Sequence, residues 1–514
     1  MPRIPLAELD GKSFDVVVIG AGMNGASAAQ QLTAQGYSVL LVDKADYSSG
    51  ASGRSARQLH CGLRYLAPGK SIWEFVRRPS KFVVASRMAR QAMIARAEFV
   101  KRAPNRVVAY QGSLPVYQDS TYRRWQTEIA FRLLRALGGS EIPLDYKWHK
   151  PGHTAEAPLA SLLRDQDKLL GVVTYREYQF DWPERICLDM ISDARQMGMV
   201  SRNYTSVERM RLNGDTWNIE VRDALGSNGV ATVSGRRVLN MGGTWIDDIN
   251  RTATLNAPKY IRGTKGAFLM VQLPPEFVGH GMHTSNRKNE GHSLYPFRGM
   301  HTIGPTETMF EGGLDDVRST DDDIDFLIDE TNYNFPALNL KRENILYSWA
   351  GVRPLGADPL YPEGKRSREI HDLKGIGMAG VYAMTAGPIM SHRSAGQEMA
   401  ELVKSQIRPS RPLPDCFNVS AVGNSAASKA VVTSQFSADE DAHSLADLMF
   451  RRLGLSWTSS MGSERVTDIA RKSGLWTDDE IPRQVEGYLK YVHDEFYFDP
   501  DKHVTPIRLL PRQS

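Results

Sequence analysis

The chain has 514 residues and a mass of 57.4 kDa. This length exceeds the usual range of a single domain and predicts two or three packed units. Hydrophobic residues make up 41% and charged residues 24% of the sequence, which is ordinary for a globular protein and argues against long disordered regions. The formal net charge of +4 is small for this length, so charge alone gives no reason to expect a nucleic-acid partner.

Cysteine usage and hydropathy favour a cytoplasmic protein. Cys61, Cys187 and Cys416 lie far apart, without the spacing of a disulfide framework or a metal site, which is typical of a reducing compartment. No apolar run reaches the roughly 18 to 20 residues that cross a bilayer, and the N-terminal stretch carries acids where a secretory signal is apolar. We expect a cytoplasmic location, with peripheral contact to the inner face of the membrane left open.

The clearest local pattern is FDVVVIGAGMNGASAAQQLTAQGYSVLLVDK, which begins at Phe14. Residues 15–19 are a short apolar run rich in valine, which predicts a parallel strand buried on both faces. A helix from Asn24 to Gln35 should follow and end at Gly36. A second strand then runs to Asp43. This order of strand, glycine turn, helix and strand predicts a Rossmann-type unit.

The turn carries three glycines in the spacing that a dinucleotide requires, at Gly20, Gly22 and Gly25. They allow a tight turn, a close approach of the backbone to a pyrophosphate, and close packing of the helix on the strand. Free N–H groups at the helix start would face the phosphates. Asp43, eighteen residues after Gly25, would accept a hydrogen bond from a ribose hydroxyl. Together these features predict a dinucleotide site.

Later segments indicate further elements. Residues 174–198 should run from an extended stretch into a helix, and residues 216–245 alternate like strands before a turn of small residues. The acidic run 321–323 is typical of a helix start, with acids at its positive end, rather than of a metal site. Three prolines within 408–414 predict a linker. The helical spacing beyond it predicts a separate helical module.

The stretch SGASGRSARQLHCGLRYL, residues 49–66, helps to distinguish between two cofactors. A Rossmann-type turn can hold a nicotinamide or a flavin nucleotide. After the second strand a nicotinamide enzyme would normally continue with another alternating unit. Here the chain runs through small residues and arginines, which suit wrapping a pyrophosphate and pressing backbone against a flat ring. The stretch therefore favours a flavin.

The sequence resembles the FAD-dependent glycerol-3-phosphate dehydrogenases, members of the larger D-amino acid oxidase-like flavoprotein group. The resemblance rests on VVVIGAGMNGASAAQQL with VLLVDK, on SGASGRSARQLHCGLRYL, on VLNMGGTW followed by TKGAFLMV and TIGPTET, and on YSWAGVRPL followed by SRE. The helical tail from DLMFRRLGL to YLKYVHDEF is also similar. The likeness therefore runs from residue 14 to residue 496.

The resemblance implies an α/β fold with a Rossmann-type FAD-binding domain, an interleaved α+β substrate domain and a C-terminal helical domain. The expected division gives the FAD-binding domain residues 14–110, 165–260 and 341–408, the substrate domain residues 111–164 and 261–340, and the helical domain residues 409–514.

FAD is the implied cofactor, and the residues expected to bind it lie in the glycine turn, at the end of the second strand, in the 49–66 stretch, and at two later turns of small residues. They are Gly20, Gly22, Asn24, Gly25, Asp43, Lys44, Ser49, Ser52, Arg54, Ser55, Arg57, His60, Gly62, Gly242 and Gly387.

For the substrate, the resemblance implies that Arg64, Tyr65 and Arg353 face it near the flavin as catalytic residues, with Arg64 and Arg353 binding its anionic group. Arg368 matches a further arginine that holds the substrate phosphate, and a structural ion pair is an equal alternative for it. A guanidinium group suits a phosphate because its rigid fork donates two parallel hydrogen bonds and its charge survives burial. We therefore expect a small anionic substrate.

The sequence departs from the family pattern in the substrate wall. Phe268 stands where the family has a histidine after Lys-Gly-Ser, and in AGPIMSHR Pro388 and His392 replace a lysine and a tyrosine. His392 is a candidate catalytic base because an imidazole titrates near neutral pH; alternatively, it faces away from the flavin in the first turn of a helix. His60 is expected to brace the flavin or the backbone. Neither histidine has metal-ligand spacing, and no metal is expected.

Residues 70–106 are basic and amphipathic, with ten Lys or Arg and two Glu. Trp73, Phe75, Phe82 and Phe99 are interleaved with these charges. Such a segment suits a helix lying on an anionic bilayer, as well as a solvated helix whose aromatic residues face the core. No nucleic-acid reader motif accompanies the charge, so no nucleic-acid partner is expected.

These observations predict an FAD-dependent dehydrogenase that oxidises the secondary hydroxyl of a small polyol phosphate. By resemblance the reaction is sn-glycerol 3-phosphate to dihydroxyacetone phosphate, by hydride transfer to flavin N5, with a quinone or another carrier as electron acceptor. The altered substrate wall leaves a second hypothesis, oxidation of a different hydroxy acid, sugar acid or amine. A third is a flavin-binding scaffold without turnover. A homodimer is also left open.

Overall fold

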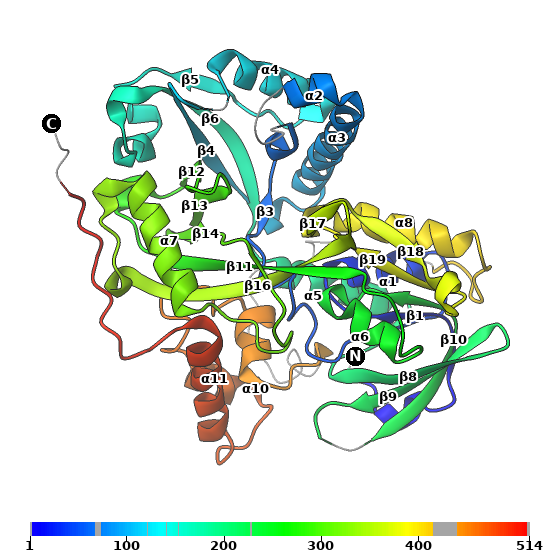
Figure 1. Cartoon of the computed structure of the whole chain (residues 1–514). Coiled ribbons are helices and arrows are strands. Elements are labelled where there is room, and N and C mark those ends of the chain that lie inside the picture. Colours follow the sequence, from blue (N-terminus) through cyan, green and yellow to red (C-terminus); the bar gives the residue numbers. More distant parts are fainter. Residues whose placement is uncertain are drawn as a thin grey trace.

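The computed structural model describes residues 3–66, 73–120, 122–139, 141–152, 154–226, 229–414 and 439–510. Two large sheets form the body of the molecule, with a helical lobe above the second sheet and a C-terminal helical module below it (Figure 1). Cys416 lies outside the described residues, whereas Cys61 and Cys187 are buried, as their positions in apolar surroundings require.

Within the described residues the first sheet has eight strands, in the order β18-β19-β10-β1-β2-β7, with β9 beside β10 and β8 beside β9. The pairs that join β19, β10, β1, β2 and β7 are all parallel. The strands are β1 (Ser13–Ile19), β2 (Val39–Val42), β7 (Val200–Arg202), β8 (Thr205–Asn213), β9 (Thr216–Asp223), β10 (Val230–Asn240), β18 (Glu369–Asp372) and β19 (Val381–Thr385).

The second sheet has eleven described strands, mostly antiparallel, in the order β17-β16-β11-β14-β13-β12-β4-β6-β3, with β15 on β11 and β5 on β6. They are β3 (Gln58–Leu59), β4 (Val107–Tyr117), β5 (Lys147–His149), β6 (Leu169–Phe180), β11 (Ile261–Val271), β12 (His280–Ser285), β13 (Gly291–Phe297), β14 (Met300–Gly304), β15 (Thr308–Met309), β16 (Ile345–Asp358) and β17 (Tyr361–Lys365).

Helices pack against both sheets (Figure 1). In the described part of the chain they are α1 (Met23–Ala34), α2 (Trp73–Arg77), α3 (Pro79–Arg102), α4 (Arg124–Leu134), α5 (Pro183–Gln196), α6 (Ile246–Arg251), α7 (Asp321–Asn334), α8 (His392–Lys404), α10 (Val466–Ser473) and α11 (Ile481–Phe496). None of them is long and apolar enough to pass through a bilayer.

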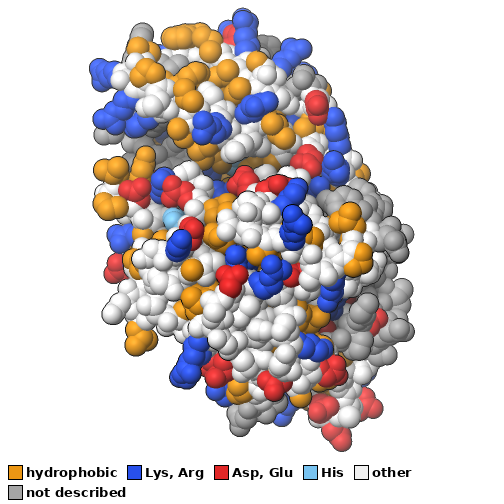
Figure 2. All heavy atoms as spheres, turned by 90° about the vertical axis from the view of Figure 1, so that its right-hand side faces the viewer, with side chains coloured by type: hydrophobic (Ala, Val, Ile, Leu, Met, Phe, Trp, Pro, Cys, Tyr) orange, Lys and Arg blue, Asp and Glu red, His pale blue; other side chains and the backbone are white. Residues whose placement is uncertain are grey.

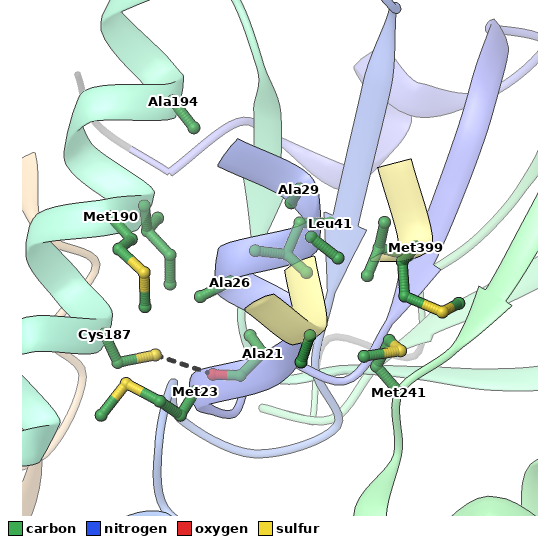
Figure 3. Packing of buried hydrophobic residues seen from close by; sticks show 14 of the residues in the cluster. Ala21, Met23, Ala26, Ala29, Leu41, Cys187, Met190, Ala194, Met241 and Met399 are labelled. Carbon is green, nitrogen blue, oxygen red and sulfur yellow. Dashed lines mark hydrogen bonds between the residues drawn. The ribbon is translucent and has the colours of Figure 1, made fainter. Parts of the chain in front are cut away.

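The helix α1 lies between α5 and α8 and packs against the parallel sheet (Figure 3). Its inward face is built from small residues such as Ala26 and Ala29, which allow the methionines of the neighbouring helices, Met190 and Met399, to approach (Figure 3). The thiol of Cys187 donates to the carbonyl oxygen of Ala21 at 3.2 Å. This close packing fixes the position of the glycine turn, because the turn leads directly into α1.

The C-terminal module is part of the body of the protein rather than an appendage. Its aromatic residues, among them Trp457 and Phe496, share one core with Phe268 and Trp349 of the second sheet. The Trp349 and Trp457 ring centroids lie 5.4 Å apart, edge to face. We conclude that the module and the sheet stabilise each other through this aromatic core.

The predicted local elements are confirmed with shifts of a few residues. Residues 15–19 lie in β1, and the helix after the glycine turn begins at Met23 and ends at Ala34. The extended stretch before the 174–198 helix is β6 and the helix is α5. Strands β6 and β16 pair within the second sheet although they fall inside ranges expected for the FAD-binding domain. Sheet pairing alone does not set domain limits, so the predicted boundaries stay a prediction.

Replacing Gly396 of α8 by alanine should destabilise the protein. A Cβ there would lie 2.7 and 2.8 Å from the backbone C and O of Ser27 in α1, so the two helices must separate, at a cost of about 1–3 kcal/mol. Urea unfolding of Gly396→Ala would measure this loss. Gly375→Ala is the control, because a Cβ at Gly375 meets nothing within 4 Å; equal stability of the two variants would contradict the prediction.

Candidate active site

A cavity of about 1250 Å³ lies where the two sheets and the C-terminal module meet. One wall is formed by the carboxyl ends of the parallel strands, since Gly20, Asp43, Met241 and Ala386 directly follow β1, β2, β10 and β19 and all line the cavity. Open parallel sheets bind ligands at this edge. The position of the cavity thus follows from the strand order of the first sheet.

Two of the three glycines in the turn, Gly20 and Gly25, leave no room for a side chain. Gly20 has φ +104°, and a Cβ there would lie 2.6 Å from the carbonyl oxygen of Met241. A Cβ at Gly25 would overlap the carbonyl oxygen of Gly20. The start of α1 therefore opens directly onto the cavity, where its free N–H groups attract an anion.

Asp43 is fixed at the end of β2 by two backbone groups. Its carboxylate accepts hydrogen bonds from the Ala21 N–H at 2.7 Å and the Ala45 N–H at 3.0 Å. Burial raises the pKa of Asp43 to about 6, and the two backbone bonds offset only part of this rise. Next to it, Lys44 pairs with Asp315 at 2.5 Å and lies 4.5 Å above the Trp245 ring.

Residues 49–57, which we call the small-residue loop, follow Asp43 and Lys44 and are held in place by their arginines. Arg54 bonds Glu495 of α11 at 2.8 Å and the Val317 carbonyl at 2.5 Å. Arg57 forms a two-pronged pair with buried Glu184, at 2.7 and 3.1 Å. Both guanidinium groups thus carry carboxylate partners from the protein. The loop presents its serines and backbone to the cavity, which Ser49, Ser52 and Ser55 line.

Asn24, Gly242 and Gly387 line the cavity where the two later turns close on α1. The Asn24 amide donates to the Gly387 carbonyl at 2.8 Å, and a Cβ at Gly387 would lie 2.5 Å from that amide nitrogen. A Cβ at Gly242 would overlap the side chain of Ile249. Small residues at these positions are therefore required by packing around the cavity.

At the other end of the cavity, one turn of 3-10 helix, Leu63–Leu66, carries Arg64 and Tyr65. Arg64 is exposed to the cavity and makes no hydrogen bond or ion pair with any residue that the structure describes. His60 also lines the cavity, with its ring 5.5 Å from that of Tyr65. Its Nδ1 accepts from the Gly62 N–H at 3.1 Å. Burial, with Arg64 and His283 nearby, lowers the pKa of His60 to about 3, so the ring is neutral at pH 7.

Two more arginines face this end. Arg353, on β16, has a buried Nη1 without a partner among the described residues. Burial and the charge of Arg64 lower the pKa of Arg353 to about 10. Glycine at position 266 makes room for it, because a Cβ there would lie 2.7 Å from Arg353 Nη2. Arg366 also lines the cavity, and burial and Arg64 lower its pKa to about 10 as well.

Four residues expected at the site do not line this cavity: Gly25, Gly62, Arg368 and His392. Gly62 packs against α3, where a Cβ would lie 3.0 Å from Ala92. Arg368 pairs with Glu398 of α8 and bonds Ser391 at 3.0 Å, which is the structural ion pair kept as the alternative for it. His392 is fully buried; its Nδ1 donates to the Ile389 carbonyl at 2.7 Å.

Sequence reasoning missed several groups of lining residues, among them residues 204–207, residues 312–315 and the two groups described next. The family resemblance points to Arg368 and gives no signal for Arg366, although both belong to the segment KRSRE. The C-terminal module also contributes, through residues Ser444, Leu445, Ala446, Asp447, Arg451, Gln484, Gly487, Tyr488 and Tyr491. No local motif marks these residues, because long-range contacts bring them to the cavity: Arg54 bonds Glu495 of α11, and Arg451 pairs with Asp46. Among the described residues no cluster of His, Cys, Asp or Glu could hold a metal ion.

Comparison with known proteins identifies similar chains along most of the sequence. A glycerol-3-phosphate dehydrogenase of Synechocystis is 28% identical over 426 residues, which cover 79% of this chain and 72% of the relative. An aerobic glycerol-3-phosphate dehydrogenase of Staphylococcus aureus is 26% identical over 515 residues, 96% of this chain and 86% of the relative.

The fold is shared with a solved structure and with a described family. The Bacillus halodurans glycerol-3-phosphate dehydrogenase, solved in complex with FAD, superposes with a TM-score of 0.70 at 19% identity and covers 96% of this chain and 97% of its own. The family model described as FAD dependent oxidoreductase matches residues 15–402. The chain therefore belongs to the FAD dependent oxidoreductase family.

Proposed function

We propose that this FAD-dependent oxidoreductase is a dehydrogenase that oxidises the secondary hydroxyl of sn-glycerol 3-phosphate to dihydroxyacetone phosphate. The observation that supports this proposal most is the positive charge of Arg64 and Arg353 in the cavity, which no carboxylate of the described residues pairs. A buried guanidinium nitrogen without a partner, such as Nη1 of Arg353, favours an anionic ligand, and the neighbouring charge of Arg64 strengthens this preference. The names of the similar proteins supply the substrate, since both curated relatives are glycerol-3-phosphate dehydrogenases.

FAD is the cofactor of the family, and the cavity fits it. Its volume of 1250 Å³ exceeds the roughly 300–1,000 Å³ of ordinary ligand pockets, which leaves room for a dinucleotide and a small substrate together. In our proposal the turn Gly20–Gly25 holds the pyrophosphate, Asp43 the ribose, and the loop 49–57 with Gly387 the flavin. When bound, FAD supplies the two-electron oxidation of the alcohol carbon.

The residues of the chain then bind and orient the substrate. Arg64 and Arg353 donate to the phosphate, and Tyr65 orients the polyol. His60 braces the turn that carries Arg64: since its Nδ1 accepts from the Gly62 N–H, the neutral ring carries its hydrogen on Nε2. We assign no role as a base to His392, because it is buried with its ring 5.6 Å from that of Phe99 in α3 and does not line the cavity.

Affinity for FAD should fall in acid, below the pKa of about 6 that Asp43 has in the cofactor-free protein. A ribose hydroxyl bonds the ionised carboxylate, so binding below that pKa must first remove a proton, and the Kd of FAD rises by up to about tenfold per pH unit. In the cofactor-free protein the same shift lowers stability as pH rises from about 4 to 6, because the folded state binds this proton more tightly than the unfolded chain.

Fluorescence titration of the cofactor-free protein with FAD between pH 5 and pH 8 would measure this dependence. Asp43→Asn should bind FAD more weakly at every pH and lose the slope, because it has no proton to release. A variant that keeps the slope would show that another group is responsible.

Anaerobic mixing of the FAD-loaded protein with candidate substrates tests the reaction itself. We expect sn-glycerol 3-phosphate to bleach the flavin absorbance, and glycerol, hydroxy acids, sugar acids and amines to leave it unchanged. Bleaching only by another compound would instead support the second hypothesis, which the Phe268 and Pro388 departures motivate. Absence of bleaching by any compound would favour the scaffold.

Arg353→Ala should raise the sn-glycerol 3-phosphate concentration needed for half-maximal bleaching by roughly 100-fold, because a buried charged hydrogen-bond donor is lost. FAD content after gel filtration should stay unchanged. Loss of FAD instead would mean that Arg353 supports the cofactor rather than the substrate.

We infer that the helical lobe formed by α2, α3 and α4 contacts an anionic bilayer. A quinone in that bilayer would then accept the electrons from the reduced flavin. Apolar side chains stand exposed on α2, α3 and α4, namely Val76, Phe82, Val83, Val84, Ile94, Trp125 and Ile129. Exposed arginines lie among them, at positions 77, 78, 87, 90, 123 and 124. Figure 2 shows hydrophobic and basic side chains together over the upper part of the face that it draws. Phe99 faces the core but Phe82 does not. Mixed apolar and basic surfaces of this kind bind anionic lipid.

Sedimentation with vesicles checks this contact. The protein should pellet with phosphatidylglycerol vesicles and much less with phosphatidylcholine vesicles, and salt should weaken the binding. Val83→Glu should reduce the pelleted fraction severalfold, since Val83 is 56% exposed on α3. Leu360→Glu is the control, as Leu360 is 84% exposed beside β17. If the wild-type protein pellets with neither vesicle, the contact does not exist.

A further inference from the structure

We propose that Arg366 is a third substrate-binding arginine of the cavity, that Glu307 holds it in place, and that the three arginines together select a phosphate ester over a carboxylate. The proposal rests on the proposed function, since it assigns a further ligand for the same substrate.

The backbone directs Arg366 and Arg368 to different places. Arg366 directly follows β17, and the chain bends at Ser367 before β18 begins. Arg366 lines the cavity together with Tyr65 and Pro388. Arg368 lies against the start of α8, where Glu398 and two serines take its guanidinium. Only the first of these two arginines is therefore within reach of a ligand in the cavity.

The partners of Arg366 leave it able to bind a ligand. Its Nη2 pairs with Glu307, which follows β14 and precedes β15. A guanidinium group has five N–H donors in a rigid fork. One carboxylate on Nη2 therefore orients the group and leaves other N–H donors, those of Nη1 among them, for a ligand. Arg57 differs, because both of its Nη atoms bond Glu184.

The charges at this end of the cavity do not balance. Arg64 has no partner among the described residues, Arg353 has an orphan Nη1, and Arg366 has Glu307. Three positive charges and one negative charge leave a net charge of about +2. The carboxylates that line the cavity elsewhere bond other groups of the protein: Asp43, Asp46, Asp248, Asp315 and Asp447.

The three arginines line one cavity, and Arg64 is close enough to the other two to act on their pKa values. The charge of Arg64 lowers the pKa of both Arg353 and Arg366. A surface ion pair with only a structural role would gain nothing from a position beside two further cations. A bound anion would offset the repulsion among the three guanidinium groups. The arrangement therefore favours the binding of an anion.

The size of the charge indicates the class of anion. A phosphate monoester carries about −1.5 to −2 at pH 7 and neutralises the cluster, and its three oxygens can meet three guanidinium groups. A carboxylate carries one charge and two oxygens, so one positive charge of the cluster would stay without compensation. The site should therefore discriminate against hydroxy acids and amino acids.

The test uses the FAD-loaded protein and two readouts. Anaerobic flavin bleaching gives the half-saturating concentration of sn-glycerol 3-phosphate, and the shift of thermal unfolding with inorganic phosphate or acetate gives anion binding without turnover. We expect Arg366→Ala to raise the half-saturating concentration by roughly 10- to 100-fold with little change in the maximal rate. It should remove most of the stabilisation by phosphate. FAD content should stay at the wild-type level.

Three comparisons make the result specific. Glu307→Gln should raise the half-saturating concentration severalfold, because Arg366 is no longer fixed. Arg211→Ala, an exposed arginine on β8, is the control and should match the wild type. A larger loss in Arg368→Ala than in Arg366→Ala would overturn the proposal, as would an Arg366→Ala variant with wild-type affinity for both ligands. Stronger stabilisation by acetate than by phosphate would overturn the assigned anion class.

The two proposals can fail separately. If sn-glycerol 3-phosphate does not bleach the wild-type flavin, the proposed reaction is wrong, whereas the phosphate measurement on Arg366→Ala still decides whether Arg366 binds an anion. If the wild type is bleached and Arg366→Ala behaves like it, only the role of Arg366 is wrong.

Discussion

The cavity depends on a buried ion pair that joins three distant parts of the chain. Arg57 belongs to the small-residue loop, Glu184 to the first turn of α5, and Trp457 to the C-terminal module. The Trp457 indole donates to the same carboxylate at 3.1 Å, while the guanidinium lies 4.0 Å from the indole ring. Breaking such a pair by removal of one partner costs about 3–5 kcal/mol. The loop, and with it one wall of the cavity, keeps its shape because these three groups satisfy one another.

The arginines of the cavity fall into two kinds that residue type alone does not separate. Arg54 and Arg57 are neutralised by protein carboxylates and therefore act as scaffold. Arg64 and Arg353 have no carboxylate partner in the part of the chain that the structure describes, which keeps their charge available for a ligand. What distinguishes them is whether another element brings an acid to the guanidinium. The electrostatics of recognition are thus decided as much by where the acids lie as by where the bases lie.

This dependence on partners explains how far the sequence could predict the structure. The unit from β1 to Asp43 could be predicted because its strand, glycine turn and helix are local and each residue type has one physical reason for its place. The position of Arg368 could not be, since Glu398 lies on another element thirty residues away and the bend at Ser367 leaves no pattern in the sequence. The same holds for Tyr491, which meets Arg54 across 437 positions.

The contribution of α11 to the cavity also constrains how the protein matures. The pocket begins with the glycine turn near the start of the chain and closes with Gln484, Gly487, Tyr488 and Tyr491 near its end. A ribosome has therefore made almost the whole polypeptide before all the walls of the pocket exist. The last wall of the pocket therefore depends on α11, and a chain cut short before this helix would lack that wall.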